Sequence, residues 1–320
     1  MSGAARDLPR NVLSSAPGSF MLSGEHAVLR GQSALVAASQ QRATVRLQRR
    51  NDQKITILSA LGSCEMQMGA ISVERPFHFA GAAIEALRSE GLVAGFDMRI
   101  ETAMPPDVGL GSSAAVTVAV YAAVYAFVHG AIPDKKILWE ACRDIIRSVQ
   151  GRGSGADVAA SVYGGVVLYE QNAGVLDQFV DNLPEFSLFY VGYKTPTADV
   201  IKIVDKKRLQ SSALFHELDG RMDQATTSAA EAIRRGNLEA LGLALHAGQE
   251  VMRGYGVCDE NLETLITRLT AMDCVIAAKI SGSGLGDCVL VLGAVPESAG
   301  IPFRQIPVAI DPQGVFVELK

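Results

Sequence analysis

The sequence predicts an α+β fold built of two domains. The chain has 320 residues, which corresponds to about two domains at roughly 150 residues each. Hydrophobic residues make up 48% of it, enough for two cores. Strand-like segments fill the first part of the chain, and long helical segments dominate the second. We place the boundary in a polar stretch just before residue 184, giving domains of residues 1–183 and 184–320.

The first part of the chain contains three strand-like segments and a helix. Residues 43–50 ("ATVRLQRR") and 54–58 ("KITIL") flank a polar turn and are interpreted as a β-hairpin. Residues 77–91 have a helical composition and end at a glycine. In "FDMRIETAM", residues 96–104, apolar and charged residues alternate, which predicts a half-buried strand.

Residues 108–133 contain no Asp, Glu, Lys or Arg, which raises the question of a membrane span. A spanning helix needs about 20 apolar residues. The apolar part, 114–128, is shorter and is bounded by glycines, serines and a proline. We therefore expect a buried central helix and no membrane partner. A second helix is predicted at 134–149, with Asp134 as its N-cap.

The second part of the chain begins with a strand at 186–193. Helical segments follow around 211–234, 236–252 and 259–271. A strand, a glycine loop and another strand come next, in "VIAAKISGSGLGDCVLVLG", and two short strands close the chain.

Composition excludes several classes of protein. There are 29 Lys and Arg against 34 Asp and Glu, a net charge of -5, which argues against nucleic acid as a partner. Five scattered cysteines without a CxxC spacing indicate reduced thiols rather than a disulfide framework or zinc site. The N-terminal segment lacks the apolar core of a signal peptide, so we expect a cytoplasmic protein.

The segment "PPDVGLGSSAA", residues 105–115, predicts an anion-binding loop. Its glycines permit close approach of a ligand. The first amides of the helix that follows lack intrahelical partners and lie at the positive end of the helix dipole. An ordinary helix start would have the same composition. The P-loop pattern G-x-x-x-x-G-K-[ST] is absent, and no Rossmann βαβ unit follows Gly109.

Two further motifs accompany this loop: "SSAPGSFMLSGEHAVLRGQSALVAA" at 14–38 and "KISGSGLGDCVLVL" at 279–292. In order, spacing and content the three motifs resemble the signature motifs of the GHMP kinases, over nearly the whole chain. The resemblance implies a two-domain fold with the active site in the interdomain cleft. It also implies an ATP-dependent kinase that acts on a small molecule and uses Mg²⁺.

The resemblance assigns ligands to the motifs. It implies that Mg²⁺ bridges the phosphates with help from the Ser113 hydroxyl, and that Gly282 and Ser283 of the third motif line the substrate side. The phosphates of ATP would be bound by Pro105, Gly109, Leu110, Gly111, Ser112, Ser113 and Ala114.

Asp157, in "GSGADVAAS", is the predicted catalytic carboxylate. In the mevalonate-kinase branch the matching Asp accepts or orients the proton of the substrate hydroxyl. A helix N-cap is the alternative role for it. Those kinases place a Lys beside this Asp, and here that position is Ser19, which we predict as the second catalytic residue. Either another cation, Arg152 or Lys194, supplies the charge, or turnover is poor.

The residue types around the predicted metal site also depart from the family. The position of the Mg²⁺-ligating Glu is Ile146. Asp144 and Glu140 lie on one helix face nearby but out of register, where a solvated surface is their simpler role.

The acceptor is predicted to be mevalonate, with phosphomevalonate as the alternative. Glu25 and His26, in "GEHAVLRGQSAL", are typical of mevalonate kinase, although a structural role for His26 stays open. "QGRGSGADVAASVYGG" and "SGSGLGDC" resemble phosphomevalonate kinase, and Arg152 suits a phosphate or carboxylate. A non-catalytic relative that binds nucleotide or a small acid, and a homodimer, are also left open.

Overall fold

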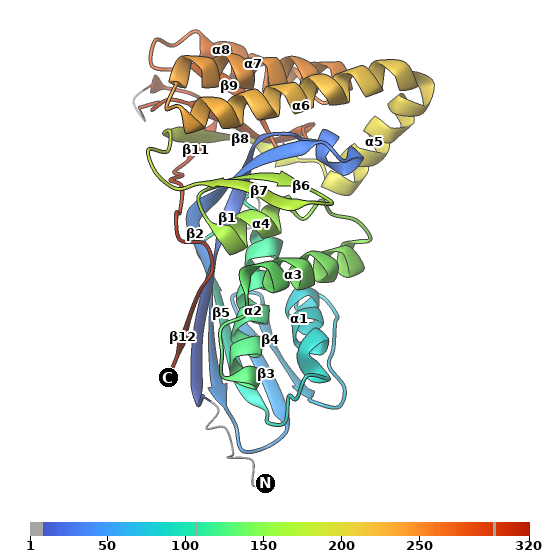
Figure 1. The fold of residues 1–320 in the computed structure, drawn as a ribbon, viewed down its shortest axis with the longest axis vertical. Coiled ribbons are helices and arrows are strands. Elements are labelled where there is room, and N and C mark those ends of the chain that lie inside the picture. Colours follow the sequence, from blue (N-terminus) through green and yellow to red (C-terminus); the bar gives the residue numbers. More distant parts are fainter. Residues whose placement is uncertain (1–8, 106–107, 297–298) are drawn as a thin grey trace.

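A computed structural model describes residues 9–105, 108–296 and 299–320. Two β-sheets organise the chain, and each carries its own helices (Figure 1). The fold is mixed α and β, as predicted. The larger assembly, sheet A, contains β1 (Asn11–Ser23), β2 (Ser33–Arg49), β3 (Lys54–Ser59), β4 (Gly62–Gln67) and β5 (Phe96–Thr102), together with β6 (Val166–Glu170), β7 (Gly174–Phe179) and β12 (Phe316–Leu319).

The strands of sheet A run in the order β12-β1-β2-β5-β3-β4. β6 pairs with the N-terminal part of β2, residues 33–37. The prediction of strands at 43–50, 54–58 and 96–104 is confirmed, but the hairpin is wrong. β5 inserts between β2 and β3, antiparallel to β2 and parallel to β3, and the hairpin partner of β3 is β4. Phe96, Met98 and Ile100 on β5 are buried, as their alternation predicts.

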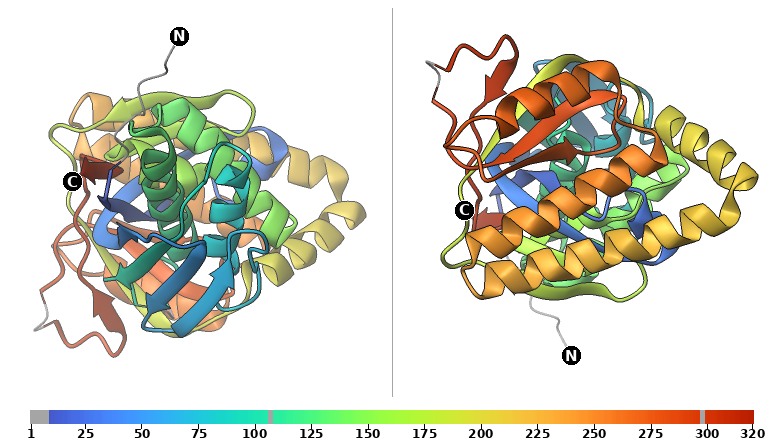
Figure 2. Two further views of the ribbon diagram at one scale, coloured as in Figure 1. Left: turned by 90° about the horizontal axis from the view of Figure 1, so that it is seen from below. Right: turned by 90° about the horizontal axis from the view of Figure 1, so that it is seen from above.

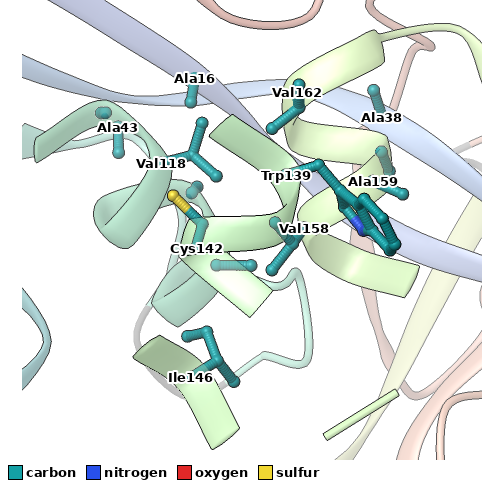
Figure 3. Packing of buried hydrophobic residues seen from close by; sticks show 14 of the residues in the cluster. Ala16, Ala38, Ala43, Val118, Trp139, Cys142, Ile146, Val158, Ala159 and Val162 are labelled. Atoms are coloured by element: carbon teal, nitrogen blue, oxygen red, sulfur yellow. The ribbon is translucent and has the colours of Figure 1, made fainter. Parts of the chain in front are cut away.

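Four helices cover sheet A: α1 (His78–Arg88), α2 (Ser112–His129), α3 (Lys135–Gln150) and α4 (Ala156–Tyr163). α2 and α4 pack against β1 and β2, and α1 and α3 pack against α2. Figure 3 shows this layer: Val118 of α2, Cys142 of α3 and Val158 of α4 lie below Ala16 of β1 in this view. Asp134 caps α3, as predicted, by accepting hydrogen bonds from two backbone amides.

α2 is the predicted central helix. It is long and apolar enough to meet the criteria for a membrane span, yet 72% of its residues are buried inside the protein. The helix lies between sheet A and α1, α3 and α4. Its apolar composition is therefore explained by its place in the core.

The smaller sheet, sheet B, has the order β11-β8-β10-β9, with β8 (Phe186–Lys194), β9 (Ala277–Ser281), β10 (Gly286–Leu292) and β11 (Arg304–Ile306). Its helices are α5 (Thr197–Gln210), α6 (Ser212–Arg234), α7 (Leu238–Tyr255) and α8 (Glu260–Thr270). The predicted strands and the last three helices are confirmed, while α5 was not predicted. α6 and α7 lie side by side over one end of the molecule (Figure 2).

Long strands connect the two halves. The upper part of β1 reaches sheet B, where the Ser281 hydroxyl donates a hydrogen bond to the Met21 carbonyl oxygen over 2.9 Å. A short 3₁₀ helix, Ala27–Arg30, follows β1 and contacts α6. The first sequence motif thus runs from one half of the protein into the other.

Candidate active site

A cleft of about 1560 Å³ lies between the two halves. The start of α2, the loop before α4, the end of β8 and the loop between β9 and β10 all face it. Most of the predicted site residues line this one cleft, namely Glu25, His26, Gly109, Gly111, Ser112, Ser113, Ala114, Arg152, Asp157, Gly282 and Ser283. A smaller groove of about 460 Å³, lined by Arg46 and Arg99 among others, lies on the open face of sheet A.

The predicted phosphate loop leads directly into α2. Gly111 is the N-cap of α2 and has a left-handed backbone (φ 62°). Ser112 and Ser113 form the first turn of the helix and line the cleft. The free amides of this turn and the helix dipole point into the cleft, which suits an anion. Of the preceding segment, Pro106 and Asp107 lie outside the described residues, and Pro105 is described but is not part of the cleft lining.

The loop packs tightly against the first motif. The Ser19 amide donates a hydrogen bond to the Leu110 carbonyl oxygen over 3.0 Å. A side chain at Gly111 would overlap the Ser19 hydroxyl group. Ser19 and Leu110 are fully buried and support the loop from behind. Glycine at position 111 therefore serves both the left-handed turn and the close contact with β1.

Asp157 lies at the start of α4 and points toward Ser19. The Ser19 hydroxyl donates a hydrogen bond to Asp157 Oδ1 over 2.7 Å. The N-cap of α4 is Gly155, and Asp157 makes no capping hydrogen bond. The alternative interpretation of Asp157 as a helix cap is therefore wrong. Ser19 contacts both the phosphate loop and Asp157, so these two features lie close together.

The pKa of Asp157 is raised, mainly by desolvation. The carboxylate opens onto the cleft and is solvent-accessible there, but it lies deep within the protein. Because the Asp157 carboxylate lies deep in the protein, its pKa is raised, and because solvent reaches it through the cleft, the rise in pKa is limited. The Ser19 hydrogen bond and the Lys194 charge lower this pKa, whereas the Asp287 charge raises it further.

Glu25 and His26 follow β1 and lie at the boundary between the halves. His26 has a left-handed backbone (φ 60°), and its Nε2 is 2.9 Å from the Ser283 carbonyl oxygen. Burial lowers the pKa of His26, against the raising effects of the Ser283 carbonyl and the Glu25 charge. The imidazole is therefore neutral near pH 7. Its ring lies edge-on to Tyr255, with centroids 5.5 Å apart.

Lys279 on β9 was not predicted as a site residue. Its ammonium group pairs with Glu25, and both side chains are almost fully buried. Glu25 Oε2 has no hydrogen-bond partner among the described residues. A single Lys inside an otherwise apolar strand, just before the glycine loop, was the available sequence signal, because an isolated buried charge needs a partner.

The third motif brings Asp287 to the phosphate loop. Asp287 Oδ1 accepts a hydrogen bond from the Gly109 amide over 3.1 Å, and Oδ2 is 2.7 Å from Lys194 Nζ. Of the two cations considered as substitutes for the missing motif-one Lys, Lys194 is the one whose charge acts on Asp157. Arg152 lines the same cleft from the loop before α4.

The cleft wall near α3 is apolar at the position of the family's Mg²⁺-ligating Glu. Ile146 packs in the core layer of Figure 3 and also borders the cleft. Asp144 reaches the cleft as well and pairs with Arg143 over 2.9 Å. Within the described parts of the chain, no cluster of three or more His, Cys, Asp or Glu side chains could hold a metal by itself.

Family models match both halves of the chain. The model of the GHMP kinase N-terminal domain matches residues 78–165, and the model of the GHMP kinase C-terminal domain matches residues 229–300. Mevalonate kinase from Aeropyrum pernix is 30% identical, covering 88% of this chain and 89% of the relative. Mevalonate kinase from Archaeoglobus fulgidus is 29% identical, covering 91% and 96%.

Solved structures share the fold. A crystal structure of a mevalonate kinase superposes with a TM-score of 0.79 at 20% identity, covering 94% of this chain and 99% of that chain. Streptococcus pneumoniae phosphomevalonate kinase in complex with phosphomevalonate and AMPPNP gives 0.73 at 18% identity, covering 89% and 93%. Family models, whole-length relatives and fold agree with the three motifs in the cleft, so this chain belongs to the GHMP kinase family and is an ATP-dependent small-molecule kinase.

Proposed function

We propose that this kinase transfers the terminal phosphoryl group of ATP to the hydroxyl group of mevalonate. The arrangement of Ser19 carries the proposal. Its backbone contacts the phosphate loop and its side chain contacts Asp157, so the ATP phosphates and the carboxylate share one end of the cleft. Such an arrangement suits in-line transfer from a bound nucleotide to a hydroxyl group beside a base.

In this mechanism Asp157 accepts the proton of the acceptor hydroxyl while the acceptor oxygen attacks the γ-phosphorus. The bond between the γ-phosphorus and the bridging oxygen breaks, and its electron pair stays on ADP. The raised pKa of Asp157 makes it a stronger base than an ordinary carboxylate. The Gly109 and Leu110 amides already donate to Asp287 and to the Val108 carbonyl oxygen, so the amides at the start of α2, from Ser112 to Ala114, bind the phosphates and bring the reactants together.

The residues at the loop fit a magnesium ion that the nucleotide largely holds. Magnesium prefers oxygen ligands, and in nucleotide sites several of these oxygens come from the phosphates and from water. Ser113 offers a hydroxyl oxygen in the cleft, whereas the nearby Asp157 and Asp287 already have partners. Bound Mg²⁺ would neutralise phosphate charge during transfer. We expect Ser113 to hold it, together with the phosphates and water.

The acceptor side is formed by the first and third motifs. His26, Gly282 and Ser283 border the cleft from one side, and Arg152 borders it from the loop before α4. A guanidinium group suits the carboxylate of a small hydroxy acid. The whole-length similarity to mevalonate kinases supports mevalonate as that acid. We expect the enzyme to act in the cytoplasm, and a homodimer stays open.

Phosphomevalonate is the second candidate acceptor. Arg152 favours it, because a guanidinium group suits a phosphate as well as a carboxylate. The segment "SGSGLGDC", which contains Asp287, also resembles the third motif of phosphomevalonate kinases. The third alternative, a non-catalytic nucleotide-binding relative, is disfavoured by the combination of the phosphate loop with Asp157.

Release of ADP separates these candidates. Purified protein is mixed with ATP, Mg²⁺ and either mevalonate or phosphomevalonate, and ADP is followed over time. The proposal expects a higher kcat/KM for mevalonate. A higher value for phosphomevalonate would support the second candidate, and nucleotide binding without ADP release in the presence of either acceptor would support the third.

In an active enzyme Asp157→Ala should lower kcat by about 10²–10⁴-fold with nucleotide affinity nearly unchanged.

A further inference from the structure

Lys194 lies at the end of β8, where the half built on sheet B meets the phosphate loop. Its Nζ is 2.7 Å from Asp287 Oδ2, and 32% of its side chain is exposed, on the cleft side. A side chain at Gly109 would overlap both the Lys194 ammonium group and the Asp287 carboxylate. The ammonium group therefore rests directly against the first glycine of the loop.

Asp287 is held in an unusual conformation that favours this contact. Its backbone is left-handed (φ 74°), as is that of Leu285 (φ 53°). Residues other than glycine adopt this conformation at a cost, although Asp tolerates it better than most. Strained residues of this kind are concentrated at functional sites. Here the conformation directs a buried carboxylate to the Gly109 amide, with Lys194 on its other oxygen.

The charge of Lys194 also reaches the predicted base. Among the described residues, Lys194 is the cation whose charge lowers the pKa of Asp157. Lys194 therefore contacts the phosphate loop at Gly109 and influences Asp157 through its charge, so we place its ammonium group beside the space between the loop and Asp157. The phosphoryl group in transfer has to pass through that space.

We propose that Lys194 binds the terminal phosphate of ATP and supplies the positive charge that Ser19, at the motif-one lysine position, cannot. This inference rests on the proposed kinase mechanism. In the free enzyme Asp287 holds Lys194 beside the loop. When ATP binds, the ammonium group pairs with γ-phosphate oxygens and stays protonated throughout. The acceptor proton still passes to Asp157, and the electron pair of the broken bond still leaves with ADP.

Nucleotide binding tests the proposal without an acceptor. The affinities for ADP and for the non-hydrolysable analogue AMPPNP are measured by calorimetry with Mg²⁺ present. Lys194→Met should weaken AMPPNP binding by about 10–100-fold, as expected for loss of a charge-assisted hydrogen bond. ADP binding should change by less than about threefold, since ADP lacks the terminal phosphate. Equal losses for both nucleotides, or no loss for AMPPNP, would overturn the proposal.

Kinetics provide a second readout. Lys194→Met should lower kcat by about 10²–10³-fold, the usual effect of removing a group that stabilises transition-state charge. Lys194→Arg, which keeps the charge, should recover part of that loss. Lys202→Met is the matched control, because Lys202 also pairs with an Asp, Asp199, over 2.9 Å, but on the exposed surface of α5. It should leave kcat and both affinities unchanged.

The two measurements separate this inference from the proposed function. If wild-type protein releases no ADP with either acceptor, the substrate assignment fails, yet the comparison of AMPPNP with ADP still decides the role of Lys194. If wild-type protein turns over mevalonate and Lys194→Met keeps full kcat, the proposed function stands and the role of Lys194 is refuted.

Discussion

Two lysine–carboxylate pairs each include one residue of the third motif, Lys279 or Asp287, and their surroundings differ sharply. Lys279 and Glu25 are 0% and 2% exposed and join the two halves of the protein. In the other pair, Asp287 is 4% exposed but Lys194 is 32% exposed and faces the cleft. The ammonium group of the buried pair is closed to ligands, whereas a cation at the edge of a cleft can exchange its carboxylate for a ligand. The same chemistry therefore suits structure in one place and binding in the other.

Removing each lysine in turn tests the difference between the two pairs most directly. Lys279→Met should lower the free energy of unfolding by about 3–5 kcal/mol, because it leaves Glu25 as an uncompensated buried charge. Lys194→Met should lower it by only about 1 kcal/mol, since the Lys194 ammonium group is accessible to solvent and Asp287 keeps its hydrogen bond to the Gly109 amide. Urea denaturation of both variants measures the difference. Losses of equal size would contradict the distinction between the pairs.

A double variant sharpens the assignment of the buried pair. Adding Glu25→Gln to Lys279→Met should recover about 1–3 kcal/mol of the free energy of unfolding, because the uncompensated charge disappears. Adding Glu25→Gln to Lys194→Met should give additive losses within about 0.5 kcal/mol, as for sites that share no partner. Recovery of stability in both backgrounds would show that Glu25 is destabilising by itself.

The cleft pair is expected to control the acid limb of the pH profile. In the proposed mechanism Asp157 must be ionised to accept a proton, so kcat should fall as the pH drops through its pKa. Asp287 raises that pKa and Lys194 lowers it. Asp287→Asn should therefore move the limb to lower pH and Lys194→Met to higher pH, each by up to about one unit.

This prediction is checked by measuring kcat across the acid range for both variants and for Lys202→Met. The Lys202→Met control should leave the limb in place, because its pair lies on the surface of α5. Shifts of both cleft variants in the same direction would show that another group titrates.

The smallest effect is expected from Ser19→Ala. The hydrogen bond from Ser19 holds the Asp157 carboxylate in one orientation, and loss of this positioning should reduce kcat by about three- to tenfold. Ser161→Ala is the matched control, because the hydroxyl of Ser161 also bonds to β1, at the Pro17 carbonyl oxygen over 2.7 Å. It should affect the stability of the protein but not kcat in steady-state assays.

Local patterns were sufficient to predict most elements of the fold. Alternation located β5, and an Asp after a proline located the cap of α3. The predicted hairpin at 43–58 failed because strand order depends on distant segments. β5 hydrogen-bonds to both β2 and β3, and no feature of the turn between them shows that a third strand will separate them. α5 was missed because its hydrophobic periodicity is weak.

The motifs of the candidate site could be located in the sequence because each combines particular residue types at a fixed spacing. The phosphate loop and the third motif could be identified as glycine loops beside a helix or strand, and both face the cleft. The partners of these residues could not be predicted in the same way. Lys279 meets Glu25, and Asp287 meets the amide of Gly109, only after the two halves pack together. Such pairings depend on tertiary structure, which sequence spacing does not encode.

The strand that carries Ser19 depends on a segment from the far end of the sequence. β1 pairs with β2 on one side and with β12, residues Phe316–Leu319, on the other. During synthesis on the ribosome β1 emerges early, yet its second partner emerges only after sheet B has been made. Until then the N-terminal part of β1, residues 12–15, is a sheet edge that could pair with another chain. Correct completion of the strand that carries Ser19 is thus a late event in the biogenesis of this kinase.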